Sequence, residues 1–122
     1  MSTLKVTNIA GLTGSSTNVI EGLAKTWGNL NGTGTIALRD SYNVSSTTDN
    51  GTGQYRFSYS NSMSNGNYGF SFGGSYTGTF SWGAVNSSAA PATSYIDYVQ
   101  GDRNGSNQDA TYACIEINGD LA

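Results

Sequence analysis

The residues of this chain that could carry catalysis are few, because it contains no histidine and a single cysteine. The commonest general base and the commonest metal ligand are therefore missing, as are the Ser-His-Asp and Cys-His arrangements of nucleophilic catalysis. Hydrolysis of a glycoside would need two carboxylates that face each other across a cleft. The candidates are Asp40, Asp49, Asp97, Asp102, Asp109 and Glu116. Most of them lie in turn-like sequence, where Asp caps its own backbone, so we predict that the protein is not an enzyme and needs no cofactor.

Two polar turns resemble metal or phosphate loops only superficially. Residues 49–51 and 101–104 combine acids with glycine, but neither segment has the alternating acids of a dedicated calcium site. The Gly-Thr-Gly segments at 32–34 and 51–53 are too short for phosphate-binding loops, and they adjoin strand-like runs. One cysteine cannot build a structural zinc site. We predict turns at these positions and no metal site.

Binding chemistry is better represented than catalytic chemistry. Carbohydrates stack on aromatic rings, and nearby Asn, Asp or Arg side chains bond their hydroxyl groups. The late part of the chain offers such a set, which consists of Trp82, Tyr95, Tyr98, Asp102, Arg103 and Asn104. The alternative is that its three aromatic residues belong to the core or to contacts between subunits.

The composition is that of one turn-rich β domain. The 122 residues include 17 glycines and one proline, while eight Tyr, four Phe and two Trp argue against disorder because aromatic rings contribute large burial energies. A net charge of −3 gives no electrostatic footprint for nucleic acid or an anionic membrane. No apolar run is long enough to span a membrane, and the absence of a signal-peptide pattern indicates synthesis in a cytoplasm.

Short extended runs joined by glycine-marked turns dominate the first half of the chain. The run 25–30 is followed by the turn 32–34, and the turn 49–53 leads into the run 54–60. Apolar and polar residues alternate strictly over 54–60, which is the period-two pattern of a half-buried strand. Between these runs, 36–44 reads as one further strand.

The run 36–44 has one irregularity. Its large side chains fall on one parity, and they are Ile36, Leu38, Tyr42 and Val44. Arg39 and Asp40 interrupt the pattern. Either a β-bulge turns them outward, or they pair across a subunit interface, where a buried ion pair would favour register over stability.

The second half of the chain supplies the remaining strands. The aromatic runs 68–72 and 76–82 predict a hairpin, 95–99 predicts a strand covered on both faces, and 110–117 predicts the last strand. Cys114, which excludes an intrachain disulfide, is expected to be a buried small hydrophobe in that last strand. Seven or eight short strands predict an antiparallel β-sandwich or barrel-like module. Two-sided aromatic strands also indicate a homo-oligomer.

The first 23 residues are predicted to form an N-terminal arm, and residues 24–122 the β domain. Residues 4–9 have the pattern of a strand, whereas 18–23 fits a short helix or an extended segment equally well. The candidate anchoring residues are Leu4, Val6, Ile9, Val19 and Leu23.

Residues 24–63 also carry a set of short motifs. They are Ala24-Lys25 before Trp27, Asn31-Gly-Thr-Gly-Thr35, Arg39 with Ser41, Asn43-Val-Ser-Ser46, and Thr48-Asp-Asn-Gly-Thr-Gly53 before Tyr55. Together they resemble a domain found near the C-termini of bacteriophage tail-fibre and related virion proteins. The likeness covers roughly a third of the chain, and Gly28 and Leu30 depart from it, since larger apolar or aromatic residues are expected there.

The resemblance implies a non-enzymatic, homotrimeric virion protein made in the host bacterial cytoplasm. Its arm would join other virion proteins, and its tip would adhere to a host-surface glycan, where several weak sites together give avidity. The alternative is a capsid decoration or head-fibre protein that stabilises the shell and binds no receptor. A glycan-degrading spike is disfavoured by the short chain and the missing acid/base pair.

Overall fold

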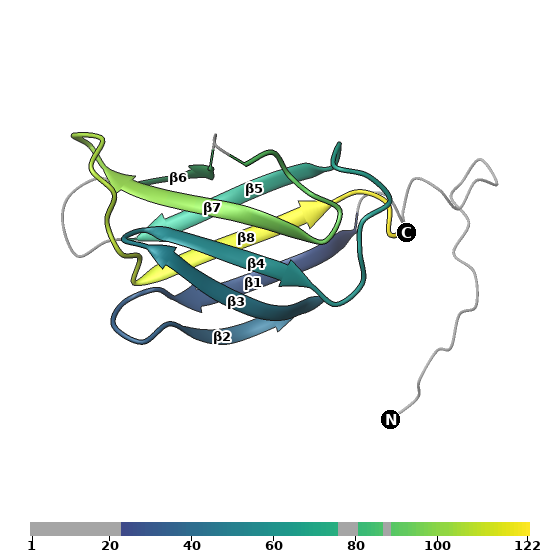
Figure 1. Ribbon diagram of the computed structural model, residues 1–122, viewed down its shortest axis with the longest axis horizontal. Coiled ribbons are helices and arrows are strands. Elements are labelled where there is room, and N and C mark those ends of the chain that lie inside the picture. Colours follow the sequence, from purple (N-terminus) through teal and green to yellow (C-terminus); the bar gives the residue numbers. More distant parts are fainter. Residues whose placement is uncertain (1–22, 76–80, 87–88) are drawn as a thin grey trace, which may run out of the picture.

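The chain folds into a β-sandwich of eight antiparallel strands in a computed structural model, which confirms the predicted all-β class (Figure 1). The structure describes residues 23–75, 81–86 and 89–122, so the predictions for residues 1–22 lie outside it. No helix within the described residues is long and apolar enough to cross a membrane. The strands are β1 (Ala24–Asn31), β2 (Ala37–Tyr42), β3 (Val44–Gly51), β4 (Gln54–Tyr59), β5 (Gly69–Ser75), β6 (Ser81–Val85), β7 (Tyr95–Asp102) and β8 (Tyr112–Asn118).

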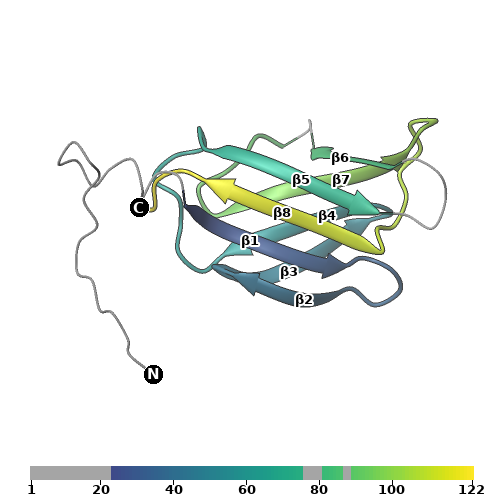
Figure 2. The same ribbon diagram turned by 180° about the vertical axis from the view of Figure 1, so that it is seen from behind.

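The strands are divided equally between two sheets. Sheet A has the order β2-β1-β8-β5, and sheet B has the order β3-β4-β7-β6. The sheets lie face to face, with sheet B in front in Figure 1 and sheet A in front in Figure 2. The pairs β1–β2, β3–β4 and β6–β7 are hairpins within one sheet, and every other connection crosses between the sheets.

The run 36–44 is not one strand, as predicted, but two strands in different sheets. The chain turns at Asn43, whose φ of 58° lies in the left-handed region that Asn tolerates. The Asn43 side chain holds this corner, because its Nδ2 donates to Thr26 Oγ1 (2.9 Å) and its Oδ1 accepts the Asn61 N–H (2.7 Å). A periodicity of two does not reveal such a corner, since apolar residues continue on both sides of it.

The β-bulge that was one of the two predictions for Arg39 is present. The β1–β2 register shifts between Asn29 and Leu30, and this shift leaves Arg39 without a direct partner. Leu38 therefore pairs with Leu30 on the core side, whereas Tyr42 is 55% exposed and points outward. The prediction that Leu38 and Tyr42 share one face is thus wrong.

The predicted hairpin between residues 68–72 and 76–82 is also wrong. β5 pairs with β8 in sheet A, and β6, which carries Trp82, pairs with β7 in sheet B. Residues 76–80 lie outside the described part of the chain. The partner of β5 is distant in sequence, and β6 pairs with the strand that follows it, so local alternation could not identify either pairing.

The core consists of large side chains from the inner faces of both sheets, and tyrosine is prominent among them. Tyr55, Phe57 and Tyr59 are buried as the alternation over 54–60 predicts, and Ile115 and Ile117 face them from β8. Each such side chain contributes roughly 1.5–3 kcal/mol when it leaves water. The hydroxyls of the buried tyrosines cannot remain unpaired at low cost, and they bond to one another, to backbone groups or, for Tyr98, to the buried Gln100 side chain.

Tyr55 shows what these hydroxyls do. Its Oη donates to the Gly32 carbonyl (3.0 Å) and accepts the Ala110 N–H (3.0 Å), so one side chain joins the β1–β2 turn to the segment before β8. The Tyr59 and Tyr68 hydroxyls lie 3.0 Å apart, and Tyr68 Oη donates to the Ala92 carbonyl (2.9 Å). The interior therefore fixes the loops from within.

These tyrosines predict an alkaline instability. Burial raises the pKa of Tyr55 to about 12, and burial also raises the pKa values of Tyr59, Tyr68 and Tyr98. Because the folded pKa exceeds the unfolded value near 10, the stabilisation is complete below pH 10 and is lost as the pH rises toward about 12. Each tyrosine contributes up to about 1.4 kcal/mol of loss per pH unit. Urea unfolding at increasing pH measures this loss of unfolding free energy per pH unit. Tyr55→Phe should make the loss smaller. Tyr112→Phe, which changes an exposed ring, is the control and should leave the loss unchanged.

Two glycines with the same backbone angle predict different costs of substitution. Gly34 and Gly53 both have φ of 65°, but a Cβ on Gly34 meets nothing within 4 Å, whereas one on Gly53 would lie 2.5 Å from the Gln100 carbonyl oxygen. Gly34→Ala should cost about 1–2 kcal/mol for left-handed backbone alone. Gly53→Ala should cost about 1–3 kcal/mol more, because backbone must shift to make room. Equal losses in urea unfolding would contradict this account.

Candidate functional site

The six residues predicted to bind a ligand are only partly brought together. Tyr98 is fully buried in the core, where its Oη donates to Gln100 Oε1 (2.8 Å), so it cannot contact a ligand at the surface. Arg103 and Asn104 are exposed in the β7–β8 loop, away from this ring. The alternative prediction, that an aromatic residue of the set belongs to the core, is correct for Tyr98.

Trp82 and Asp102 of that set are neighbours, and both have structural roles. Trp82 Nε1 donates to the Asp102 carbonyl (2.8 Å), and the indole lies over Gly101 on the paired strand. Asp102 Oδ1 accepts the N–H groups of Asn104 (2.9 Å) and Ser106 (3.0 Å). This carboxylate caps its own turn, as predicted for the acids in loops. Within the described residues, no three His, Cys, Asp or Glu side chains gather as metal ligands would.

An ion pair covers part of the outer face of sheet B. Arg56 makes two bonds to Asp97, from Nε to Oδ1 (2.7 Å) and from an Nη to Oδ2 (2.8 Å), and its guanidinium lies 3.7 Å from the centre of the Tyr95 ring. Asp97 is only 6% exposed although it is on an outer face. Tyr95 is itself half-buried beneath this guanidinium, so this predicted ligand residue presents less free ring surface than an exposed tyrosine does.

The outer face of sheet A is open. A row of directly paired residues crosses all four strands, and it consists of Tyr42, Trp27, Glu116 and Ser71. Tyr42 is 55% exposed and Trp27 is 37% exposed. Paired residues of an antiparallel sheet point to the same side, so two solvent-facing rings, a carboxylate and a hydroxyl stand side by side. We call this outer surface the sheet A face.

A second aromatic ring lies farther along the same face. Tyr112, 47% exposed, is four residues before Glu116 on β8, so the two side chains share the face at a separation of about 14 Å along the strand. Arg39, displaced outward by the bulge, reaches from β2 across β1 toward β8. One Nη donates to Asn29 Oδ1 (3.3 Å), and the guanidinium is 4.2 Å from the centre of the Tyr112 ring. Unlike Arg56, Arg39 forms no ion pair with a carboxylate of the described residues.

A shallow hollow of about 280 Å³ completes the sheet A face. It is lined by Ser71, Phe72, Gly73, Cys114, Ile115 and Glu116. The outward positions of β5 carry only small residues here, which leaves the space above β8 unfilled. Cys114 borders the hollow and is half-buried on the outer side, so its predicted place in the core is wrong. Burial raises the pKa of its thiol.

Sequence reasoning missed this face, although a signal for it exists. On β1, Thr26, Gly28 and Leu30 are buried, so Trp27 and Asn29, of the opposite parity, point outward. A Cβ on Gly28 would lie 3.1 Å from the Phe57 ring. The core ring thus occupies the space of the larger residue that was expected at position 28.

Comparison of the chain with protein-family models, with curated proteins and with solved structures finds no match. The assignment of a site therefore depends on its geometry. By that criterion the sheet A face is the strongest candidate, since it combines exposed rings, hydrogen-bonding groups and a hollow.

The two arginine–tyrosine pairs predict unequal losses of stability. Arg56→Met should destabilise the fold by about 1.5–3 kcal/mol, because it leaves the nearly buried Asp97 carboxylate without its charged partner. Arg39→Met, the matched change on the other sheet, should cost less than about 1 kcal/mol, since it removes an exposed cation–π contact. Urea unfolding of both variants measures the difference, and equal losses would contradict it.

Proposed function

We propose that the protein is a non-enzymatic phage virion surface protein, a tail-fibre-tip-like module that adheres to a host-surface glycan through the sheet A face. The observation that carries the glycan assignment is the row of Tyr42, Trp27, Glu116 and Ser71, in which exposed rings stand directly beside hydrogen-bonding side chains. The proposal of a virion origin derives from the motif likeness over residues 24–63.

The chemistry of the row suits a sugar ring. The apolar face of a pyranose would stack on Trp27, and its edge hydroxyls would reach the Glu116 carboxylate and the Ser71 hydroxyl on the adjacent strands. The hollow above Gly73 gives the ring or its substituents room beside Glu116, the residue that pairs with Trp27. No bond of the sugar needs to break, because the face presents contacts and not an acid/base pair.

The spacing of the aromatic rings favours an extended ligand. Trp27 pairs with Glu116, and Tyr112 lies about 14 Å farther along β8, which is more than one sugar ring can span. Arg39 is exposed and its guanidinium lies over the Tyr112 ring, where it can donate to hydroxyl groups of a sugar bound at that end of the face. We therefore propose an oligosaccharide chain that lies across the sheet.

The charges favour a neutral glycan. Glu116 and Asp40 on the face oppose the single Arg39, and the whole chain has a net charge of −3. A polyanionic ligand would meet repulsion, whereas stacking and bonding to neutral hydroxyls would change little with ionic strength. Each contact surface is shallow, so a homotrimer that presents three copies would gain its strength through avidity.

The motif residues behind the likeness have structural roles in this fold. Thr33 Oγ1 donates to Asn31 Oδ1 (2.8 Å) in the β1–β2 turn, and Asp49 Oδ1 accepts the Gly51 N–H (2.9 Å) in the β3–β4 turn. Together with Asn43 at the corner, they shape two hairpins. They support a shared scaffold, while the ligand would be chosen by side chains such as Trp27 on its surface.

The alternative remains a capsid decoration protein that binds no receptor. Exposed Leu23 and Leu121 at one pole of the sandwich favour it, because exposed apolar side chains that lie close together suit contact with a neighbouring shell protein. In that role the rings of the sheet A face would contact another protein instead of a sugar.

Binding to purified bacterial surface polysaccharides tests the proposal. Trp27→Ala and Tyr112→Ala should each weaken binding at least about tenfold, which corresponds to about 1.4 kcal/mol. Gly73→Leu should do the same by filling the hollow; a Cβ there makes only an ordinary contact with Cys114 Cβ at 3.7 Å, so the fold should tolerate it. Phe70→Leu is the control, because this ring contacts Phe72 on the other side of β5.

The result should hold on cells. Labelled protein should bind host bacteria saturably and slow adsorption of whole phage, and Trp27→Ala should lose both effects. If folded protein binds neither cells nor polysaccharides, and Trp27→Ala instead changes the oligomeric state in light scattering, the sheet A face is a protein contact and the capsid alternative gains.

A further inference from the structure

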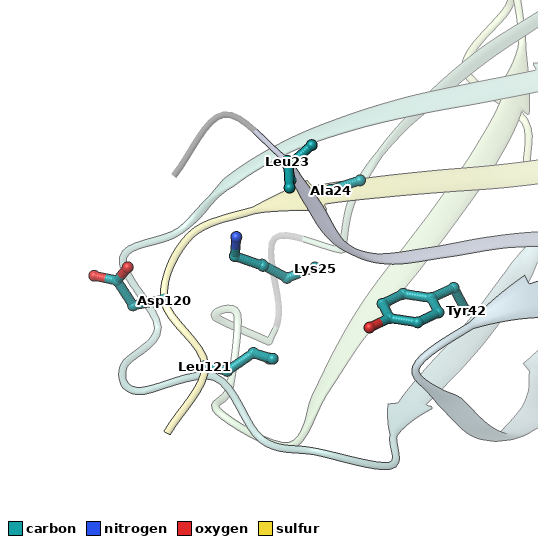
Figure 3. Close-up of a pocket in the computed structure, with 6 residues that line it drawn as sticks. All are labelled: Leu23, Ala24, Lys25, Tyr42, Asp120 and Leu121. Atoms are coloured by element: carbon teal, nitrogen blue, oxygen red, sulfur yellow. The ribbon is translucent and has the colours of Figure 1, made fainter. Parts of the chain in front are cut away.

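The C-terminal pole of the sandwich contains a second hollow, larger than the one on the sheet A face. It measures about 560 Å³ and is lined by Leu23, Ala24, Lys25, Tyr42, Asp120 and Leu121 (Figure 3). Leu23 immediately precedes β1, Tyr42 ends β2, and Leu121 lies in the tail after β8. Three segments that are distant in sequence thus build one concave surface.

The lining of this hollow combines exposed apolar side chains with two charged residues, Lys25 and Asp120. Leu23 is 55% exposed, Tyr42 55% and Leu121 38%, so three large side chains face water around one depression. Such gathered apolar surface usually marks a contact site. Its volume is in the range that accepts a ligand or several side chains.

We propose that the chain's own Val19 and Ile20 occupy this hollow. The described chain begins at Leu23, on the rim, and Val19 and Ile20 precede it by four and three residues. At no more than about 3.6 Å per residue they lie within about 14 Å of Leu23 along the chain. They are also the nearest large apolar residues upstream, since 13–18 holds only Gly, Ser, Thr and Asn.

The short tether decides between this occupant and others. A segment of the same chain a few residues away has a high effective concentration at the hollow, whereas another copy or a partner must first associate. Apolar side chains would also bury the exposed surface of Leu23, Leu121 and the Tyr42 ring. Lys25 and Asp120 contribute the charged part of the same lining.

Docking at this pole has a consequence for the sheet A face. Tyr42 lines the hollow and also belongs to the row with Trp27. A side chain packed against Tyr42 from the pole would hold its ring in place within that row. This consequence rests on the proposed function, whereas the docking itself does not.

Alkylation of a thiol placed in the hollow tests the proposal. In a Cys114→Ser background, Leu121→Cys provides the probe. Its alkylation by a maleimide should be at least about tenfold slower with the native segment than in the variant that also carries Val19→Asp and Ile20→Asp. Leu12→Asp, a matched change outside the proposed contact, should leave the slow rate unchanged. Equal rates with and without the two Asp substitutions would overturn the docking.

A mixing experiment identifies which copy supplies the segment. The probe protein with Val19→Asp and Ile20→Asp is refolded together with an equal amount of Cys114→Ser protein that has the native segment. If each chain fills its own hollow, the probe thiol still reacts fast. Protection of that thiol in the mixture would show that a neighbouring copy donates the segment, and it would overturn the assignment to the same chain. Neither result depends on glycan binding, so a failure here is distinct from a failure of the proposed function.

Discussion

The pairing of buried tyrosine hydroxyls is the constraint on which the rest of this structure depends. A sandwich of this size fills its core with rings that carry a polar atom, and each atom must find a partner away from water. Tyr55 finds partners in two loops at one end, and Tyr68 finds one in the loop before β7. Since these loops set where β1 and β8 begin and end, the same hydroxyls fix the two strands that carry most of the sheet A face.

The two outer faces contain the same arginine–tyrosine contact but differ in what else the arginine binds. Each has an arginine over a tyrosine ring. On sheet B, the Asp97 carboxylate takes two donors of Arg56 and closes the surface. On sheet A, Arg39 donates to the Asn29 amide oxygen and has no carboxylate partner among the described residues, and small residues on β5 leave a depression nearby. The contrast indicates that sheet B's face serves stability and sheet A's face is available for contact.

Much of the fold was predictable from local pattern, and most of the site was not. The alternation around Phe57 identified β4, and the interrupted parity near Arg39 signalled a bulge, because both effects act over a few residues. The corner at Asn43 was missed, since one residue with positive φ leaves the apolar pattern intact. Tyr98 was misplaced because β7 has large residues on both faces, and only the sheet order shows which side is the core.

The exposure of Trp27 was hidden for a related reason. A lone tryptophan in a strand is assigned to the core by its size, and the assignment reverses only when its neighbours Thr26 and Gly28 are known to face inward. Gly28 would be an odd core residue were it not for Phe57, which crosses from the other sheet to fill its place. Such compensation between sheets cannot be read from either strand alone.

The buried position of the tyrosine hydrogen bonds has a consequence for the residues on the surface. Because the bonds of Tyr55 to Gly32 and Ala110 lie inside the sandwich, they are independent of the side chains that point outward from β1 and β8. Outward residues can therefore be exchanged with little effect on folding, as surface positions generally can. The interior therefore acts as a fixed frame: exchange of outward residues would alter the chemistry of the sheet A face, while the hairpins and the corner at Asn43 keep their shape.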